Sequence, residues 1–158
     1  MVDDADILAR LDASAPRRLL GTGILGALGL MLLWLGAAGP EGGVWRLVFA
    51  LCGALFGAVA LALWQATRHG IVLTETGILD TSGRVLAPME DIAAVDRGMF
   101  AMKPSNGFVL RLNRPTERGW APGMWWRFGR RLGIGGVTRA AEGRAMADIL
   151  AIRLAGRG

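Results

Sequence analysis

Two uninterrupted apolar runs, Leu19–Ala38 and Leu47–Ala66, dominate the first half of the chain, and neither contains Asp, Glu, Lys, Arg or His. As an α-helix, each run of about 20 residues covers roughly 30 Å, the hydrocarbon thickness of a bilayer. The pattern therefore predicts a two-helix transmembrane hairpin over residues 19–66. This hairpin separates an N-terminal arm, residues 1–18, from a C-terminal domain, residues 67–158.

Basic side chains lie at the outer ends of the two apolar runs, where Arg17 and Arg18 precede the first and Arg68 follows the second. The connector between the runs contains a single basic residue, Arg46, which is offset by Glu41. Because basic residues are retained on the cytoplasmic side of a membrane, we expect both termini in the cytoplasm and the connector outside it.

The tryptophans and the choice of basic residue refine the expected location. Trp34 and Trp45 fall near the outer interface and Trp64 near the inner one, where an indole ring keeps its apolar edge in lipid and its N–H in water. The chain uses Arg in place of Lys, with Lys103 as its single lysine, which is typical of a GC-rich bacterial genome. The expected location is therefore the inner (plasma) membrane of a bacterium.

A cleavable export signal is the alternative to a first membrane span. Arg17 and Arg18 precede an apolar run that ends in the small residues 36–38, as a signal peptide does. Cleavage would leave one span and would place the C-terminal domain outside the cytoplasm. Because the run is long for a signal sequence and a short connector follows it, the hairpin is the favoured interpretation.

Small residues form a face on the second apolar run. Gly53 and Gly57 make a GxxxG motif that Ala50 and Ala54 extend, and Gly26 belongs to a similar set in the first run. Small side chains let helix backbones approach closely, which increases their packing contacts. The simpler interpretation is packing of the two helices of one chain, and the alternative is self-association or docking onto another membrane protein.

The C-terminal domain consists of short β-rich runs separated by turn signals. Alternation is clearest where Phe108, Leu110 and Leu112 occupy every second position. The expected strands are residues 71–74, 78–80, 84–86, 92–96, 108–113, 125–128 and 132–137. Residues 114–123 contain two prolines and are expected to form a loop.

A helix is expected at the end of the chain, with Thr138 as its N-cap. Its apolar stripe consists of Ala141, Ala145, Met146, Ile149, Leu150 and Ile152. Roughly six or seven short strands followed by one amphipathic helix predict a small α+β domain. We expect an antiparallel β barrel or sandwich that this C-terminal helix closes.

Three stretches of the C-terminal domain, Leu73–Ile78, Val85–Ile92 and Thr138–Leu154, resemble a known family. Their order is similar to that of the pleckstrin-homology-like (PH-like) domains of small bacterial two-span membrane proteins. In that family a two-helix hairpin precedes a β-rich cytoplasmic domain. The resemblance implies a PH-like fold for residues 67–158 and a function in binding, and it supplies no catalytic residues to carry over.

Residues suited to catalysis are few and scattered. His69 is the single histidine and has no cysteine or second histidine to share a metal, and Cys52 lies inside the second apolar run as a small packing group. Glu90 and Asp91 are adjacent and would point in opposite directions in a strand. The glycine-rich residues 133–136 lack the setting of a dinucleotide site and are interpreted as a bend. We therefore expect neither an enzyme nor a cofactor or metal site.

One segment, residues 111–131, combines arginines with tryptophans and contains Glu117 as its single acidic residue. The candidate lipid- or partner-binding residues in it are Arg111, Arg114, Arg118, Trp120, Trp125, Trp126, Arg127, Arg130 and Arg131. The segment could lie on anionic lipid or clamp an acidic partner protein. The plainest interpretation makes the arginines a solvated rim and the tryptophans part of a small core. The membrane anchor argues against nucleic acid as the ligand.

These features lead to two functional hypotheses. The first is a non-catalytic, membrane-anchored accessory or scaffold protein that binds another membrane protein or complex through its PH-like domain and small-residue helix face. The alternative is a sensor of anionic lipid headgroups at the inner leaflet. The expected partners are membrane lipid and either another membrane protein or a second copy of the chain.

Overall fold

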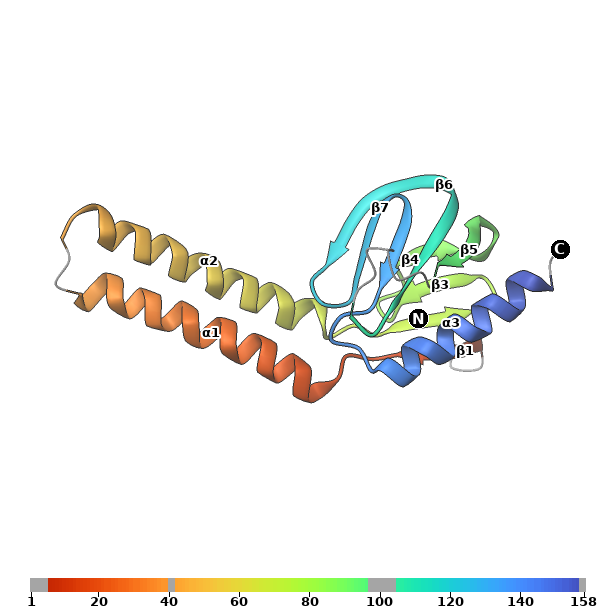
Figure 1. Ribbon diagram of the computed structural model, residues 1–158, viewed down its shortest axis with the longest axis horizontal. Coiled ribbons are helices and arrows are strands. Elements are labelled where there is room, and N and C mark those ends of the chain that lie inside the picture. Colours follow the sequence, from red (N-terminus) through yellow and green to blue (C-terminus); the bar gives the residue numbers. More distant parts are fainter. Residues whose placement is uncertain (1–5, 40–41, 97–104, 157–158) are drawn as a thin grey trace. The chain divides into compact units, whose positions relative to one another are not determined.

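The computed structural model describes residues 6–39, 42–96 and 105–156, and it divides into two compact units (Figure 1). One unit is a helical hairpin formed by Ala15–Gln65. The other is a sheet unit assembled from Met1–Ser14 and Ala66–Gly158. The N-terminal segment, expected to be an arm outside the C-terminal domain, therefore contributes to the sheet unit.

Helices α1 (Ala15–Ala38) and α2 (Val44–Ala66) are long and apolar enough to cross a membrane. Only 11% and 6% of their most apolar windows are buried, whereas the apolar face of a core helix in a soluble domain is covered. Helix α1 begins earlier than the apolar run, with Pro16 in its first turn, where the missing N–H of proline leaves no hydrogen bond unmade. The predicted pair of membrane-length helices is confirmed.

Glycines set the close approach of α1 to α2. A Cβ added to Gly53 would lie 2.8 Å from the carbonyl oxygen of Gly29, and one added to Gly36 would lie 3.1 Å from the carbonyl oxygen of Arg46. The simpler interpretation of the small residues, packing within one chain, therefore accounts for these three positions. By contrast, a Cβ at Gly26 or Gly57 would have no heavy atom within 4 Å.

The start of α1 and the end of α2 are joined by a cation–π contact. The guanidinium carbon of Arg18 lies 4.0 Å from the ring centroid of Trp64. The two helices therefore run antiparallel, and their ends that lead to the sheet unit lie together.

The sheet unit contains two antiparallel sheets. The first has the order β1-β2-β3-β4, with β1 Ile7–Leu11, β2 Ile71–Thr74, β3 Gly77–Asp80 and β4 Val85–Pro88. The second has the order β5-β6-β7, with β5 Ile92–Asp96, β6 Phe108–Ala121 and β7 Trp125–Ile134. A short 3₁₀ turn, Met89–Asp91, links the sheets. They are not closed into a barrel, so the barrel form of the expected fold is wrong and two antiparallel sheets take its place.

Strand β1 is the element that the sequence patterns did not predict. It pairs antiparallel with β2, and Leu11 is the cross-strand partner of Ile71. Leu11 is 0% exposed and belongs to the hydrophobic core of the sheet unit. The helical hairpin is therefore inserted between two neighbouring strands of one sheet.

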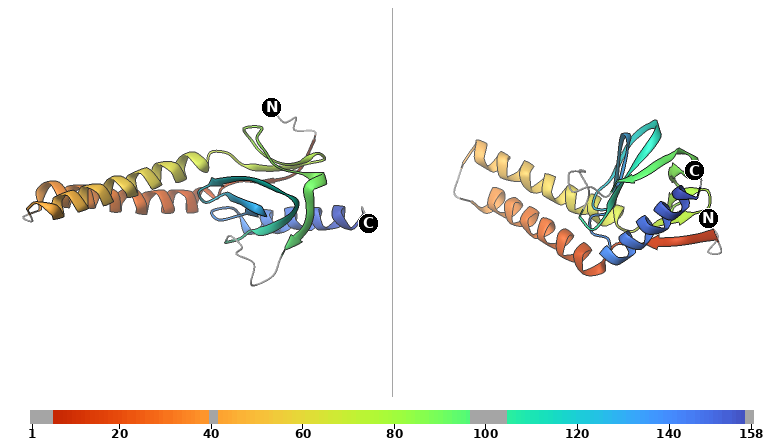
Figure 2. Two further views of the ribbon diagram at one scale, coloured as in Figure 1. Left: turned by 90° about the horizontal axis from the view of Figure 1, so that it is seen from above. Right: turned by 45° about the vertical axis from the view of Figure 1, so that its right-hand side comes forward.

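Strands β6 and β7 are longer than predicted. The expected loop 114–123 is wrong, because β6 continues to Ala121, and the two strands expected between residues 125 and 137 form the single strand β7. Pro115 lies where the β6–β7 register is interrupted, between Arg111 and Thr116, so its missing N–H leaves no ladder bond unmade. The turn between the strands contains Pro122, and Gly129 has φ 56°, a backbone conformation that glycine adopts readily. Figure 2 shows the resulting curl of the two strands.

Helix α3 (Ala140–Ala155) packs against β1, β5 and β6. Its buried residues are Gly143, Met146, Ala147 and Leu150. The predicted stripe was therefore only partly correct, since Met146 and Leu150 face the core but Ile152 is 73% exposed. Thr138 is not the N-cap, a position held by Arg139, because Thr138 is buried and forms a β-bridge with Ala13.

Candidate binding surface on the β6–β7 hairpin

The two faces of the β6–β7 hairpin can be assigned from its register. Trp120 pairs with Trp126, and Gly119 pairs with Arg127. Residues directly opposite each other on antiparallel strands share a face, and neighbours along a strand alternate between faces. One face therefore carries Trp120 and Trp126, and the opposite face carries Gly119 and Arg127.

The inner face of the hairpin packs on the first sheet. Trp125 is 5% exposed, and a Cβ at Gly119 would lie 2.9 Å from its ring, so glycine is needed for this stacking. The guanidinium carbon of Arg84 lies 5.4 Å from the Trp125 ring centroid on β7. Trp125 is thus a core residue of the domain, although it was a candidate binding residue.

Arg127 also points inward and ties the two sheets together. Its Nη1 donates a hydrogen bond to the carbonyl oxygen of Leu86 in β4 at 3.0 Å, and its Nε donates to the carbonyl oxygen of Glu117 at 2.7 Å. Burial lowers the pKa of Arg127, and the nearby charge of Arg84 lowers it further. Because an arginine pKa is so high, the side chain still carries its charge at neutral pH. Arg127 acts as a bridge within the domain.

The outer face exposes its aromatic side chains. Trp120 is 70% exposed and Phe128 is 59% exposed. The guanidinium carbon of Arg118 lies 4.6 Å from the Phe128 ring centroid, which places a cation over the aromatic surface. Phe128 belongs to the predicted segment of arginines and aromatic residues but was not among its candidate binding residues, and its alternation with Arg127 is the signal that would have added it.

Trp126 is half-buried because its indole lies across Gly133, where an added Cβ would collide with the ring. The curl of β7 brings these two residues of one strand together. Trp126 and Phe128 form a wall shared by two grooves of about 360 and 810 Å³. Arg118 and Trp120 line the smaller groove, and Arg130 and Arg131 line the larger one. We call the set Arg118, Trp120, Trp126, Phe128, Arg130 and Arg131 the outer hairpin surface.

Two further candidate arginines lie beside this surface. The Nε of Arg114 forms an ion pair with Asp91 at 3.2 Å. This contact holds β6 to the 3₁₀ turn that links the two sheets. Arg111 is exposed and is the direct cross-strand partner of Arg131. Like charges placed opposite each other on neighbouring strands are destabilising, so this pair favours an anion close by. Asp96 lines the same groove as both arginines.

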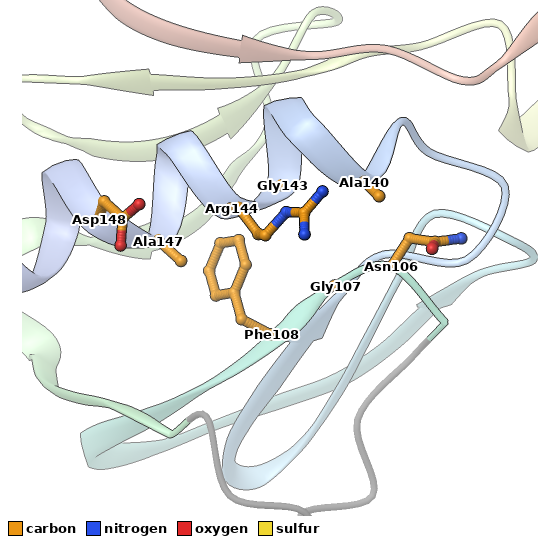
Figure 3. Close-up of a pocket in the computed structure, with 8 residues that line it drawn as sticks. All are labelled: Asn106, Gly107, Phe108, Ala140, Gly143, Arg144, Ala147 and Asp148. Carbon is orange, nitrogen blue, oxygen red and sulfur yellow. The ribbon is translucent and has the colours of Figure 1, made fainter.

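A second cavity lies between α3 and the beginning of β6 (Figure 3). It measures about 530 Å³, and Phe108 and Ala147 form part of its apolar wall. In Figure 3 the side chains of Arg144 and Asn106 lie toward one end of the cavity, and Asp148 lies farther along the helix. Its described lining contains no serine, cysteine or histidine, and Asp148 supplies its one carboxylate.

The remaining residues that could carry chemistry lie apart from one another. His69 is exposed between α2 and β2, and Cys52 is half-buried within α2. Within residues 6–39, 42–96 and 105–156, no three His, Cys, Asp or Glu side chains are grouped to hold a metal ion. The expected bend at residues 133–136 is found only in part, because Gly133 and Ile134 end β7 and the chain turns at Gly135 and Gly136, which have φ 139° and 123°.

No protein-family model, no curated protein and no solved structure matches this chain. The outer hairpin surface and its neighbouring arginines are therefore interpreted from their own geometry.

Proposed function

We propose that this chain is a non-catalytic, membrane-anchored accessory or scaffold protein that associates with another membrane protein or complex. In this proposal α1 and α2 span a bacterial inner membrane, both termini are cytoplasmic, and the sheet unit is a PH-like binding domain. The observation that carries the proposal is the outer hairpin surface. Its most exposed aromatic side chains, Trp120 and Phe128, lie outside the hydrophobic core, and Arg118, Arg130 and Arg131 belong to the same surface.

Chain connectivity supports a role at the membrane. Residues 12–14 join β1 to α1, and residues 67–70 join α2 to β2. Connectors of this length extend at most about 14 Å. Because the sheet unit has two such tethers, it stays near the membrane surface, as expected of a platform that binds other membrane components.

The helices supply a second surface for a partner. Gly29, Gly36 and Gly53 are used in packing α1 against α2, and the backbone nitrogen of Gly57 faces Gly29. A Cβ at Gly26 or Gly57 would nevertheless meet open space. Small residues of this kind let another helix approach closely. The open sides of Gly26 and Gly57 therefore supplement the outer hairpin surface as a place where a membrane partner or a second copy could bind.

Affinity purification of the tagged full-length chain from its native membrane, at native expression level and in mild detergent, tests the proposal. We expect a reproducible, stoichiometric partner whose recovery falls when Gly57→Leu blocks the open helix face. Leu55→Ile, at an exposed position of the same helix, is the matched control. Recovery of the chain with no protein partner would overturn the scaffold role.

A second candidate is a sensor of anionic lipid headgroups. The exposed Trp120 and Phe128 beside arginines favour it, because aromatic and basic side chains are the groups that enter the interface of an anionic membrane. In that case the binding of the sheet unit to anionic lipid should weaken steeply as the salt concentration increases.

A further inference from the structure

The outer hairpin surface has the chemical profile of a membrane-interface patch. Its aromatic positions, Trp120, Trp126 and Phe128, are adjacent on one face of two paired strands. Indole and phenyl rings gain from leaving water, and an indole N–H finds partners at the level of the headgroups. Because Trp120 and Phe128 are exposed to water, their rings are not stabilised by burial, and the indole of Trp120 does not contact headgroups.

Positive charge surrounds these rings. Residues 108–134 contain six arginines and a single carboxylate, Glu117. Two of the arginines, Arg114 and Arg127, have ion-pair or hydrogen-bond partners within the domain. Arg118 lies over Phe128, and Arg130 and Arg131 line the groove beside it. Three exposed arginines therefore lie next to the exposed rings, and Arg111, also exposed, is the cross-strand partner of Arg131.

The opposed pair Arg111 and Arg131 shares a groove with Arg130 and with one carboxylate, Asp96, so positive charge is in excess there. An anionic ligand between them would remove the repulsion that like charges on facing strand positions create. A phosphate group is a suitable anion for this position, because a guanidinium binds phosphate through two parallel hydrogen bonds.

We propose that the outer hairpin surface rests in the headgroup layer of an anionic bilayer, with Trp120 and Phe128 inserted and Arg118, Arg130 and Arg131 on lipid phosphates. The inference rests on the membrane anchoring in the proposed function and specifies what the hairpin contacts. A bilayer is favoured over an acidic protein because two short tethers keep the domain beside a membrane at all times, and because a flat lipid surface accommodates an open, shallow groove.

The test uses the full-length chain in nanodiscs of phosphatidylcholine alone or of phosphatidylcholine mixed with phosphatidylglycerol. Hydrogen–deuterium exchange is followed in peptides that cover residues 114–131. We expect exchange in this segment to slow several-fold in the anionic discs, and the protection to disappear as salt is raised. Peptides from β2 and β3 should exchange equally in both discs.

Variants separate a lipid contact from a change in folding. Trp120→Ala combined with Phe128→Ala, and Arg130→Gln combined with Arg131→Gln, should each abolish the lipid-dependent protection. The matched controls are Ile152→Ala and Arg144→Gln, which remove an exposed apolar and an exposed basic side chain from α3. These controls should retain the protection.

Equal exchange of the hairpin in neutral and anionic discs would overturn the inference. Protection that requires a co-purified protein would also overturn it, by assigning the surface to that protein. Carbonate extraction of native membranes tests the anchoring separately. A chain that resists extraction but shows no lipid-dependent protection would leave the membrane anchor in place and remove only the lipid contact.

Discussion

Leu11, the last residue of β1, is the cross-strand partner of Ile71, the first residue of β2, although α1 and α2 separate them in the sequence. The sheet unit is therefore a discontinuous domain with a helical hairpin inserted between two paired strands. If both helices cross the bilayer, the two strands must emerge on one side of it. Removal of the first helix as an export signal would detach β1, so the pairing favours a retained span.

Truncation of Leu11 should destabilise the sheet unit. Its side chain is 0% exposed and packs within the core, so Leu11→Ala should cost about 2–5 kcal/mol of unfolding free energy. Denaturant unfolding of the detergent-solubilised chain, followed by tryptophan fluorescence, measures this change. Ile152→Ala removes a comparable but 73% exposed side chain and should change stability by less than about 0.5 kcal/mol. Equal effects of the two variants would show that β1 is not part of the folded core.

Replacement of residues 15–66 by a short glycine–serine linker should yield a water-soluble, folded domain. The ends to be joined are close, because cross-strand partners such as Leu11 and Ile71 have Cα atoms about 5 Å apart. Circular dichroism and amide exchange would identify the fold. Residues 67–158 alone lack β1 and should be less stable. Equal stability of the two proteins would contradict the role assigned to β1.

Gly133→Ala should disturb the curl of β7. Its Cβ would collide with the indole of Trp126, which must then move away from the strand. Overpacking of this kind costs about 1–3 kcal/mol, and it should lower the melting temperature of the domain. Gly23→Ala is the control, because a Cβ at that helical position has no heavy atom within 4 Å. An unchanged melting temperature for Gly133→Ala would argue against the Trp126 packing.

Arg127 and Arg130 lie three residues apart on β7 and should differ in their contribution to stability. Arg127→Gln removes the hydrogen bond to the Leu86 carbonyl and should cost about 1–3 kcal/mol of stability. Arg130 is exposed, so Arg130→Gln should leave stability within about 0.5 kcal/mol of the parent. Thermal unfolding of both variants measures the difference. A larger loss for Arg130→Gln would reverse the assignment of inner and outer faces.

The ion pair between Glu75 and Arg153 predicts a pH effect. The two side chains meet at 2.7 Å, and the hydrogen bond from Arg153 lowers the pKa of Glu75 from its ordinary value of 4.5. A lowered folded-state pKa contributes stability above the unfolded value and loses it as pH falls through the folded value. Glu75→Gln should therefore be slightly less stable than the parent at neutral pH and equal to it in acid. Thermal unfolding of the two proteins at neutral and acidic pH measures the difference, and a difference that persists in acid would contradict this contact.

The parts of the fold that sequence patterns predicted are those with strong local signals. Two long apolar runs define α1 and α2, and the strand at Ile92–Asp96 was predicted with its observed bounds. Strand β1 was not predicted because a run of five residues, four of them apolar, is identified as a strand only by its pairing with β2. The continuation of β6 was not predicted because a proline normally indicates a loop. Pro115 is accommodated here because it lies at an interruption of the hydrogen-bond ladder between β6 and β7.

The sequence identified the segment that contains the candidate site by its residue types, but it did not show which of these residues form one surface. Arginines and tryptophans are concentrated between residues 111 and 131, but composition does not say which side of a strand each one occupies. The register sends Trp125 and Arg127 inward and leaves Trp120 and Phe128 outside. A correct assignment of the strand would have separated the two groups by alternation alone.

Cysteine accessibility in cells tests the central claim, that one membrane hairpin interrupts one domain. The single native thiol is first removed by Cys52→Ala, and then one cysteine is introduced by Asp6→Cys, Gly42→Cys or Glu90→Cys, all at exposed positions. In intact cells a membrane-impermeant thiol reagent should modify position 42 alone, and positions 6 and 90 should react only after the membrane is permeabilised. Modification of positions 6 and 90 from different sides, or of positions 42 and 90 from the same side, would contradict the account.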